Sequence, residues 1–208
     1  MCSSDLPDQL TVMGDSLFFT ATDSAHGTEL WKSDGSSTGT AILADLNPGA
    51  ASSQPSRLIV SGNKLFFYFV NATSGRELGV SDGTAQGTHL VKDIQTGTGN
   101  GTPINGKIIP FDNQVVFAGA DGSTGIEPWI SDGTEQGTVL LKDIHPGAGN
   151  TFGGPGVDSA VINGKLFFVG NDGTSSNAHG SEVWITDGTT AGTTLLKDIY
   201  PEIGRAHV

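Results

Sequence analysis

Short apolar runs recur along the chain and are separated by polar segments rich in glycine. The most apolar runs lie at residues 17–19, 65–69, 115–117 and 166–169. Apolar and polar residues do not alternate within them, so both faces of each predicted strand should be covered. This pattern predicts strands in the middle of sheets that are themselves stacked between other sheets.

A weaker apolar run precedes each of these strands, for example at residues 57–61 and 159–163. The residues between the two runs tolerate the positive φ that a two-residue hairpin requires. These dipeptides are Gly14-Asp15, Gly62-Asn63, Asp112-Asn113 and Asn163-Gly164. Each unit is therefore predicted to begin with a β-hairpin.

A polar motif follows each hairpin and recurs four times with fixed internal spacing. Its glutamates are Glu29, Glu77, Glu127 and Glu182, its aspartates are Asp34, Asp82, Asp132 and Asp187, and its tryptophans are Trp31, Trp129 and Trp184. Successive aspartates are 48, 50 and 55 residues apart. We expect the glutamate and tryptophan to lie on a third strand. An Asp-Gly turn would lead to a fourth strand at residues 41–46, 89–94, 139–144 and 194–199.

Repeated four-stranded units of about 50 residues are typical of β-propeller blades. The units span about residues 7–50, 51–98, 99–148 and 149–202. We therefore predict an all-β protein, a β-propeller or propeller-like arc of four four-stranded blades. A β-solenoid or a row of tandem small sandwiches is the alternative. Because propellers with more blades are commoner than four-bladed ones, the arc is expected to belong to a larger ring.

The two ends of the chain resemble cloning residues more than protein sequence. One choice of codons for residues 1–6 is the reverse complement of one choice for the closing residues, as in a sequencing adapter. We interpret residues 1–6 and 203–208 as adapter-derived. Residues 7–202 would then form one repeat domain, a fragment of a longer protein.

Charge and cysteine content narrow the function classes. The net charge of −12 and the acidic pI argue against a nucleic-acid partner, which requires a basic face. No apolar run approaches the roughly 20 residues of a membrane helix. Residues 7–202 contain no cysteine, which excludes a disulfide framework there. The acidity is compatible with an extracellular protein or with cation binding.

The repeated motif resembles the bacterial ELWxxDGT repeat family over nearly all of residues 10–201. The similarity includes the ending Asp143-Ile144-His145-Pro146-Gly147, which recurs at residues 198–201. This resemblance implies a propeller-like architecture and an extracellular or cell-surface location in bacteria. It implies no common activity.

A looser resemblance concerns the tryptophans. Ala21, Asp23, Gly27 and Trp31 stand at the spacing of the tryptophan-docking motif of quinoprotein propellers. The resemblance implies that each indole is buried between adjacent blades. Occurrence of all tryptophans at one repeat position also favours a structural role. Gly79 replaces the tryptophan in the second unit, so that joint should contain a gap or be filled by Tyr68 or Phe69.

The acids can be interpreted in several ways. An aspartate before glycine suits a turn, because its carboxylate accepts backbone N–H groups two residues on. Glu127 and Asp132 could instead form an acid–base pair, but such a pair in every unit is poor support for a unique catalytic site. Calcium is the more credible ligand, with Asp121 and Asp172 as candidates in loops that supply oxygen atoms.

We therefore expect a non-catalytic module that is not an enzyme and needs no cofactor, and that acts as a scaffold or adhesion surface. Its partner would be a protein or glycan surface. A carbohydrate- or calcium-binding propeller is the alternative. We expect an individual binding function in the extra residues of the fourth unit, between Asp172 and Gly180.

Overall fold

The computed structural model describes residues 6–152, 158–173 and 179–199. In these ranges the chain forms sixteen strands and no helix. The first sheet contains β1 (Asp8–Met13), β2 (Ser16–Asp23), β3 (Gly27–Ser33) and β4 (Ala41–Ala44). The second contains β5 (Ser56–Ser61), β6 (Lys64–Asn71), β7 (Gly75–Ser81) and β8 (His89–Leu90). The third contains β9 (Ile108–Phe111), β10 (Gln114–Gly119), β11 (Glu127–Ser131) and β12 (Val139–Leu140). The fourth contains β13 (Ser159–Ile162), β14 (Lys165–Asn171), β15 (Ser181–Thr186) and β16 (Thr194–Lys197).

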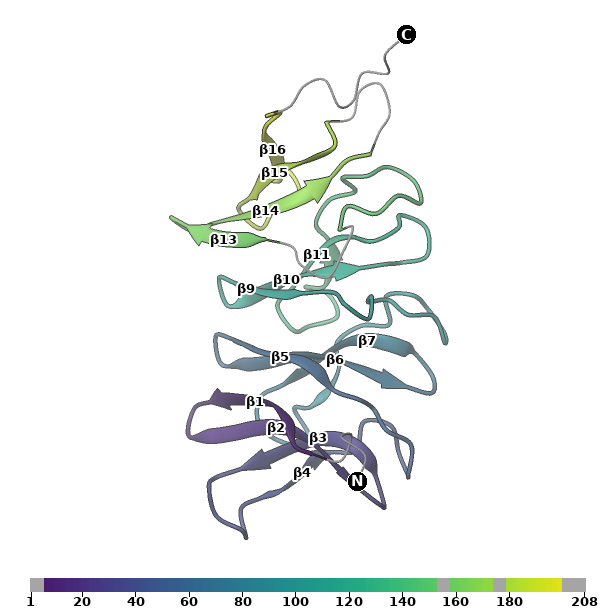
Figure 1. The fold of residues 1–208 in the computed structure, drawn as a ribbon, viewed down its shortest axis with the longest axis vertical. Coiled ribbons are helices and arrows are strands. Elements are labelled where there is room, and N and C mark those ends of the chain that lie inside the picture. The colour runs from purple at the N-terminus through teal and green to yellow at the C-terminus, as the bar shows by residue number, and fades with distance from the viewer. Residues whose placement is uncertain (1–5, 153–157, 174–178, 200–208) are drawn as a thin grey trace.

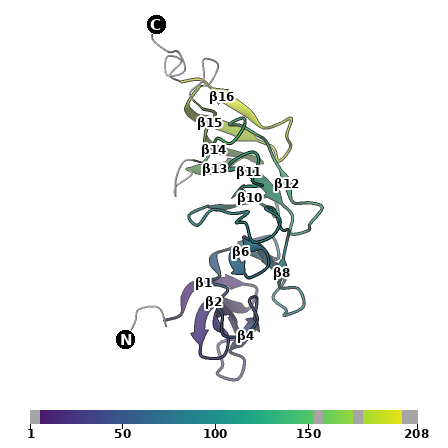
Figure 2. The same ribbon diagram turned by 90° about the vertical axis from the view of Figure 1, so that its right-hand side faces the viewer.

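Each sheet is an antiparallel meander whose strands follow the order of the chain. The four sheets are stacked one after another along the longest axis of the molecule, with the first and fourth sheets at opposite ends (Figure 1). A second view shows that the stack bends (Figure 2). The fold is a propeller-like arc of four four-stranded blades, as the repeat predicts.

The predicted hairpins are confirmed at the start of every sheet. Gly14 and Gly62 both adopt φ of 59°. Asp112 and Asn113 adopt 47° and 61°, and Asn163 adopts 52°. Strands β1 and β2 close on the pair Met13 and Ser16, and the other sheets begin in the same way. Residues that tolerate a left-handed backbone therefore set the register of each blade.

The fourth strands are shorter than the sequence predicts. In the second sheet β8 ends at Leu90, and the expected strand continued to Ile94. The N–H of Val91 still bonds to the carbonyl of Leu78 at 2.9 Å, but the chain then leaves the ladder. In the first sheet the N–H of Leu46 donates to the carboxylate of Glu29 at 3.0 Å. A side chain thus replaces the backbone partner that would have prolonged the strand.

Three apolar clusters hold the sheets together, one between each neighbouring pair. The cluster between the first two sheets contains Phe18, Leu30, Leu58, Leu65, Phe67 and Phe69. The second strand of a blade contributes to two clusters: Phe67 and Phe69 of β6 face the first sheet, and Phe66 and Tyr68 face the third. This confirms the expectation that both faces are covered for β6, and β10 behaves in the same way. The expectation is wrong for β2 and β14, because no described sheet lies against their outward faces.

No described residue belongs to a helix that could cross a membrane. The outward faces of the first and fourth sheets have no sheet against them in the described part of the chain (Figure 1).

Candidate functional site

The repeated glutamates lie on the third strands, and all four are buried. Glu29 accepts the N–H of Leu46 at 3.0 Å, and the N–H and hydroxyl of Ser53 at 2.7 and 2.5 Å. Glu127 has the corresponding contacts in the third unit, including the hydroxyl of Thr151 at 2.5 Å. These partners lie at the two ends of the linker that leads to the next blade. The carboxylate therefore fixes the linker onto its own sheet.

Glu77 lacks the hydroxyl contact. Gly101 occupies the position of the hydroxyl residue, and its N–H donates to Glu77 Oε1 at 2.7 Å. The other oxygen, Oε2, is buried and has no hydrogen-bond partner. Burial raises the pKa of Glu77 to about 7, against the opposing effect of the N–H groups of Ile94 and Gly101. Burial also raises the pKa of Glu29 and Glu127, but hydroxyl groups oppose it there.

The repeated aspartates hold the turn between the third and fourth strands. Asp34 Oδ1 accepts the N–H and the hydroxyl of Ser36 at 2.8 and 2.7 Å. Threonine makes the same two bonds in the other units, to Asp82, Asp132 and Asp187. The hydroxyl and N–H of Ser36 lower the pKa of Asp34. These are the contacts of a turn carboxylate, not of one presented to a ligand.

Two of the tryptophans lie between adjacent sheets. Trp129 is buried in the cluster that joins the second and third sheets, and Lys92 Nζ of the second unit lies 5.9 Å from its ring centroid. Trp184 is buried in the cluster between the third and fourth sheets, 5.9 Å from Lys142 Nζ. Each indole thus combines apolar burial with a cation from the preceding blade.

Trp31 differs from the other two, and the expectation that it is buried between blades is wrong for this chain. Its indole is half-buried, because no described sheet covers that face of the first blade. It stacks on Phe19 of its own sheet, with ring centroids 6.5 Å apart, and its Nε1 donates to the carbonyl of Ala21 at 3.1 Å.

Two phenylalanines fill the position that Gly79 leaves open. A Cβ on Gly79 would lie 2.6 Å from Phe67 Cε2 and 3.0 Å from Phe69 Cδ1. Phe69 is thus in the expected place. Tyr68 is not, because its side chain lies on the opposite face and donates its hydroxyl to the carbonyl of Lys107 at 3.1 Å.

The calcium candidates accept hydrogen bonds within their own loops. Asp121 Oδ1 accepts the N–H and hydroxyl groups of Ser123 and Thr124 at 2.8–3.1 Å. Burial opposes ionisation of Asp121, but these bonds outweigh it and lower its pKa to about 2. Asp172 Oδ1 accepts the N–H of His179 at 2.7 Å, and Asp172 Oδ2 lies 2.7 Å from His179 Nδ1 in a hydrogen bond. Among the described residues no three acidic, histidine or cysteine side chains are grouped to hold a metal ion. Most of the inserted loop after Asp172, at residues 174–178, lies outside the described residues.

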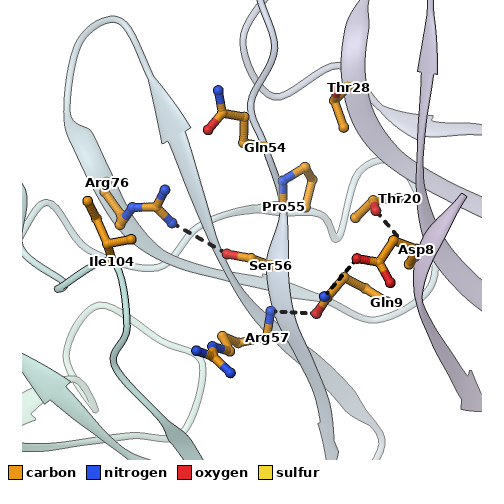
Figure 3. A pocket seen from close by; sticks show the side chains of 10 residues that line it. All are labelled: Asp8, Gln9, Thr20, Thr28, Gln54, Pro55, Ser56, Arg57, Arg76 and Ile104. Atoms are coloured by element: carbon orange, nitrogen blue, oxygen red, sulfur yellow. Dashed lines mark hydrogen bonds between the residues drawn. The ribbon is translucent and has the colours of Figure 1, made fainter. Parts of the chain in front are cut away.

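A pocket of about 470 Å³ opens between the first and second sheets (Figure 3). It is lined by Asp8, Gln9, Thr20, Thr28, Gln54, Pro55, Ser56, Arg57, Arg76 and Ile104. Figure 3 shows the guanidinium groups of Arg57 and Arg76 on one side of Ser56, with Asp8 on the other. Arg76 Nη1 donates weakly to Ser56 Oγ at 3.4 Å, and burial lowers the pKa of Arg76. In the described part of the chain neither arginine forms an ion pair with a carboxylate.

The backbone of this pocket is unusual. Gln9, Gln54 and Arg57 have φ of 59°, 49° and 60°, in the left-handed region that side chains other than glycine seldom adopt. The remaining non-glycine residues with positive φ in the described ranges belong to hairpin turns. The N–H of Arg57 bonds to Gln9 Oε1 at 3.0 Å, which joins β5 to β1. Gln9 and Arg57 hold the same repeat position, where the β1–β2 and β5–β6 ladders both shift register, so a β-bulge accounts for their backbone.

Sequence reasoning missed this pocket. Arg57 and Arg76 are the only arginines of residues 7–202, and both fall in the second unit. Because each departs from the repeat, a comparison of the units for unmatched charged residues would have singled them out. Their convergence depends on how two sheets pack, which the repeat spacing does not encode.

No family model matches the sequence, and no curated protein matches it. Among solved structures, a puromycin hydrolase mutant complexed with PGG is similar, with a TM-score of 0.52, 13% identity, and coverage of 93% of this chain and 29% of that one. Xyloglucan PUL GH43B from Bacteroides ovatus aligns with a TM-score of 0.42 and 10% identity, over 96% of this chain and 42% of that one. The chain spans less than a third of the puromycin hydrolase. At such identity the likeness concerns the fold alone.

Replacement of Trp129 tests the role of the indole between sheets. We expect Trp129→Ala to lower the free energy of unfolding by about 3–5 kcal/mol, because it empties a buried position. The matched change Trp31→Ala should cost much less in dilute solution, since that ring is half-buried. Denaturant unfolding measures both. Equal losses would contradict the assignment.

Glu77 should make stability depend on pH. The pKa of the Glu77 carboxyl is about 7 in the folded protein, whereas its ordinary value, taken for the unfolded chain, is 4.5. Between these two pH values the folded state therefore keeps the carboxyl protonated and the unfolded state does not. Stability is therefore expected to fall by about 3 kcal/mol as pH rises through this window. Glu77→Gln should flatten this dependence. The exposed carboxylate Glu135 supplies the control, Glu135→Gln, and an unchanged slope in Glu77→Gln would contradict the prediction.

Asp121→Ala tests the calcium alternative. The loss of the loop bonds should lower stability by about 2 kcal/mol, equally with added calcium and with a chelator. Asp15→Ala, in an exposed hairpin turn, is the control. The measurement is the melting temperature in both conditions. A wild-type protein destabilised by chelator, with no such response in Asp121→Ala, would restore calcium as a ligand.

Proposed function

We propose that this chain is a non-catalytic propeller module of an exported or cell-surface bacterial protein, where it serves as a scaffold or adhesion surface. The observation that carries the proposal is that the repeated acids form hydrogen bonds to the chain itself. The carboxylates of Glu29 and Glu127 are fully buried against linkers, and those of the Asp-Gly motif hold turns. Acids that are buried and hydrogen-bonded to the chain itself support a structural framework.

A carboxylate pair catalyses hydrolysis when both groups face the same substrate bond. Glu127 is inaccessible to solvent, and Asp132 bonds to Thr134 within its own turn. The two acids therefore do not converge on a space that a substrate could occupy. The exported location rests on the resemblance of the repeat, together with the acidity of the chain.

A direct assay tests the non-catalytic proposal. The purified chain should release no product from chromogenic glycosides, esters or peptides above the buffer rate. Turnover that disappears in Glu127→Gln, with the fold preserved by circular dichroism, would refute the proposal. Turnover that survives in this variant would refute it equally and would direct attention to another site.

A second candidate function, carbohydrate binding, is favoured by the pocket between the first two sheets. Guanidinium groups recognise carboxylates through paired charged hydrogen bonds. Arg57 and Arg76 could hold the carboxylate of an acidic sugar, and the hydroxyl of Ser56 and the amide of Gln54 suit its hydroxyl groups. A volume of about 470 Å³ is in the range of small-ligand sites.

Calorimetric titration with an oligogalacturonate tests this candidate. Binding should weaken about tenfold or more in Arg57→Ala and in Arg76→Ala, because each loses a charged contact. Lys165→Ala removes an exposed cation outside the pocket and should leave binding unchanged. A neutral oligogalactoside should bind much more weakly. No binding of the acidic sugar would remove this candidate and leave the scaffold proposal standing.

A further inference from the structure

A second cavity, of about 510 Å³, opens between the first two sheets at the hairpin ends of their strands, opposite to the pocket of Arg57 and Arg76. It lies between the two opening hairpins, β1–β2 and β5–β6, and the turn that follows β7. Met13 and Val60 supply apolar surface, and Lys32 supplies a cation. The corresponding boundary between the second and third sheets differs from this one at each position that keeps the space open.

The tips of the opening hairpins are bonded at the second boundary and lie apart at the first. At the second, the hydroxyl of Ser61 donates to a carbonyl of the next hairpin at 2.6 Å. A Cβ on Gly62 would lie only 2.8 Å from Asn113 Oδ1. At the first, Met13 stands in the position of Ser61 and has no hydroxyl to donate. A Cβ on Gly14, the counterpart of Gly62, would meet no atom of the described chain within 4 Å.

The lysine that holds the turn of the next sheet also changes place. At the second boundary Lys64, at the start of β6, donates to the carbonyl of Asp132 at 2.5 Å. Ser16 holds the same position in the first sheet, and its short side chain leaves this volume open. Lys32 makes the bond from the third strand instead, to the carbonyl of Gly83 at 2.9 Å. The exchange removes a long side chain from the cavity and places a cation in its wall.

Lys32 can bind an anion in addition to this carbonyl. It is the only charged residue at its repeat position, where the other units have valine or isoleucine. Its Nζ lies 5.7 Å from the ring centroid of Phe18 and forms no ion pair with a carboxylate in the described part of the chain. The nearby carboxylates of Asp34 and Asp82 accept bonds within their own turns. An ammonium group has three N–H donors, and the carbonyl of Gly83 takes one of them.

We propose that this cavity binds a small organic anion with an apolar body. The apolar body contacts Met13 and Val60, and the acid group accepts charged hydrogen bonds from Lys32 Nζ. The volume is in the range of small-ligand sites. Phe18, the aromatic residue that lines the cavity, is only 1% exposed, so its ring face is not open to stack on a sugar. The site is separate from the arginine pocket and does not depend on carbohydrate binding there.

NMR titration of the full chain with 3-phenylpropionate tests the inference, and 3-phenylpropanol is the matched neutral probe. Binding of the anion should saturate by about 10 mM, a concentration that detects weak association. The alcohol should bind about tenfold more weakly, because it lacks the charged bond to Lys32. Absence of saturable binding of the anion, or equal binding of the two compounds, would overturn the inference.

Three variants locate the site. Lys32→Met keeps an apolar side chain, removes the charge and should weaken binding of 3-phenylpropionate about tenfold. The triple variant Met13→Ser, Ser16→Lys and Lys32→Val reproduces the residues of the second boundary, so it should close the cavity and abolish binding. Arg76→Ala, in the other pocket, should bind like the wild type.

Circular dichroism checks that each variant is folded. Undiminished binding in folded Lys32→Met or in the folded triple variant would overturn the inference, as would loss of binding in Arg76→Ala alone. If the triple variant does not fold, Lys32→Met decides the outcome by itself.

Discussion

Burial of apolar faces between neighbouring sheets is the constraint on which the structure depends. Each central strand places aromatic or aliphatic side chains on both faces, so no blade can be soluble alone with both faces in water. Phe67 and Phe69 need the first sheet, and Phe66 and Tyr68 need the third. The polar contacts described above orient the blades, but the stack is stable because each sheet covers its neighbour.

The buried glutamates join each sheet of this stack to the linker that leads to the next sheet. A charged group away from water is costly unless hydrogen bonds compensate. At Glu29 two N–H groups and a hydroxyl do so, and the linker is fixed as a consequence. At Glu77, where Gly101 leaves one oxygen unpartnered, the cost appears as a raised pKa. Burial raises the pKa of all three carboxyls, and Glu77 lacks the hydroxyl that opposes this effect at Glu29 and Glu127.

Much of the architecture could be predicted because it is local. Positive-φ dipeptides fix the hairpins, and apolar runs without alternation indicate strands covered on both faces, which holds for β6 and β10 of the inner sheets. The length of the fourth strands could not be predicted, since a distant carboxylate takes over their hydrogen bonds. The surroundings of Trp31 depend on which sheet lies next to it, and the Arg57 and Arg76 pocket depends on packing between two units. The spacing of residues within one repeat determines neither property.

The substitution at Gly79 also limits the order in which repeats can follow one another. Aromatic volume there has moved from the third strand to Phe67 and Phe69 of the second, and the preceding unit carries Ala44 in place of lysine. A second copy of this unit placed behind itself would set Lys92 against a position without an indole. Duplication of the first or the second unit alone would therefore create a mismatched joint, whereas duplication of these two units together would preserve every contact. In this array the first two units are matched to each other, so they are expected to be inherited as a pair.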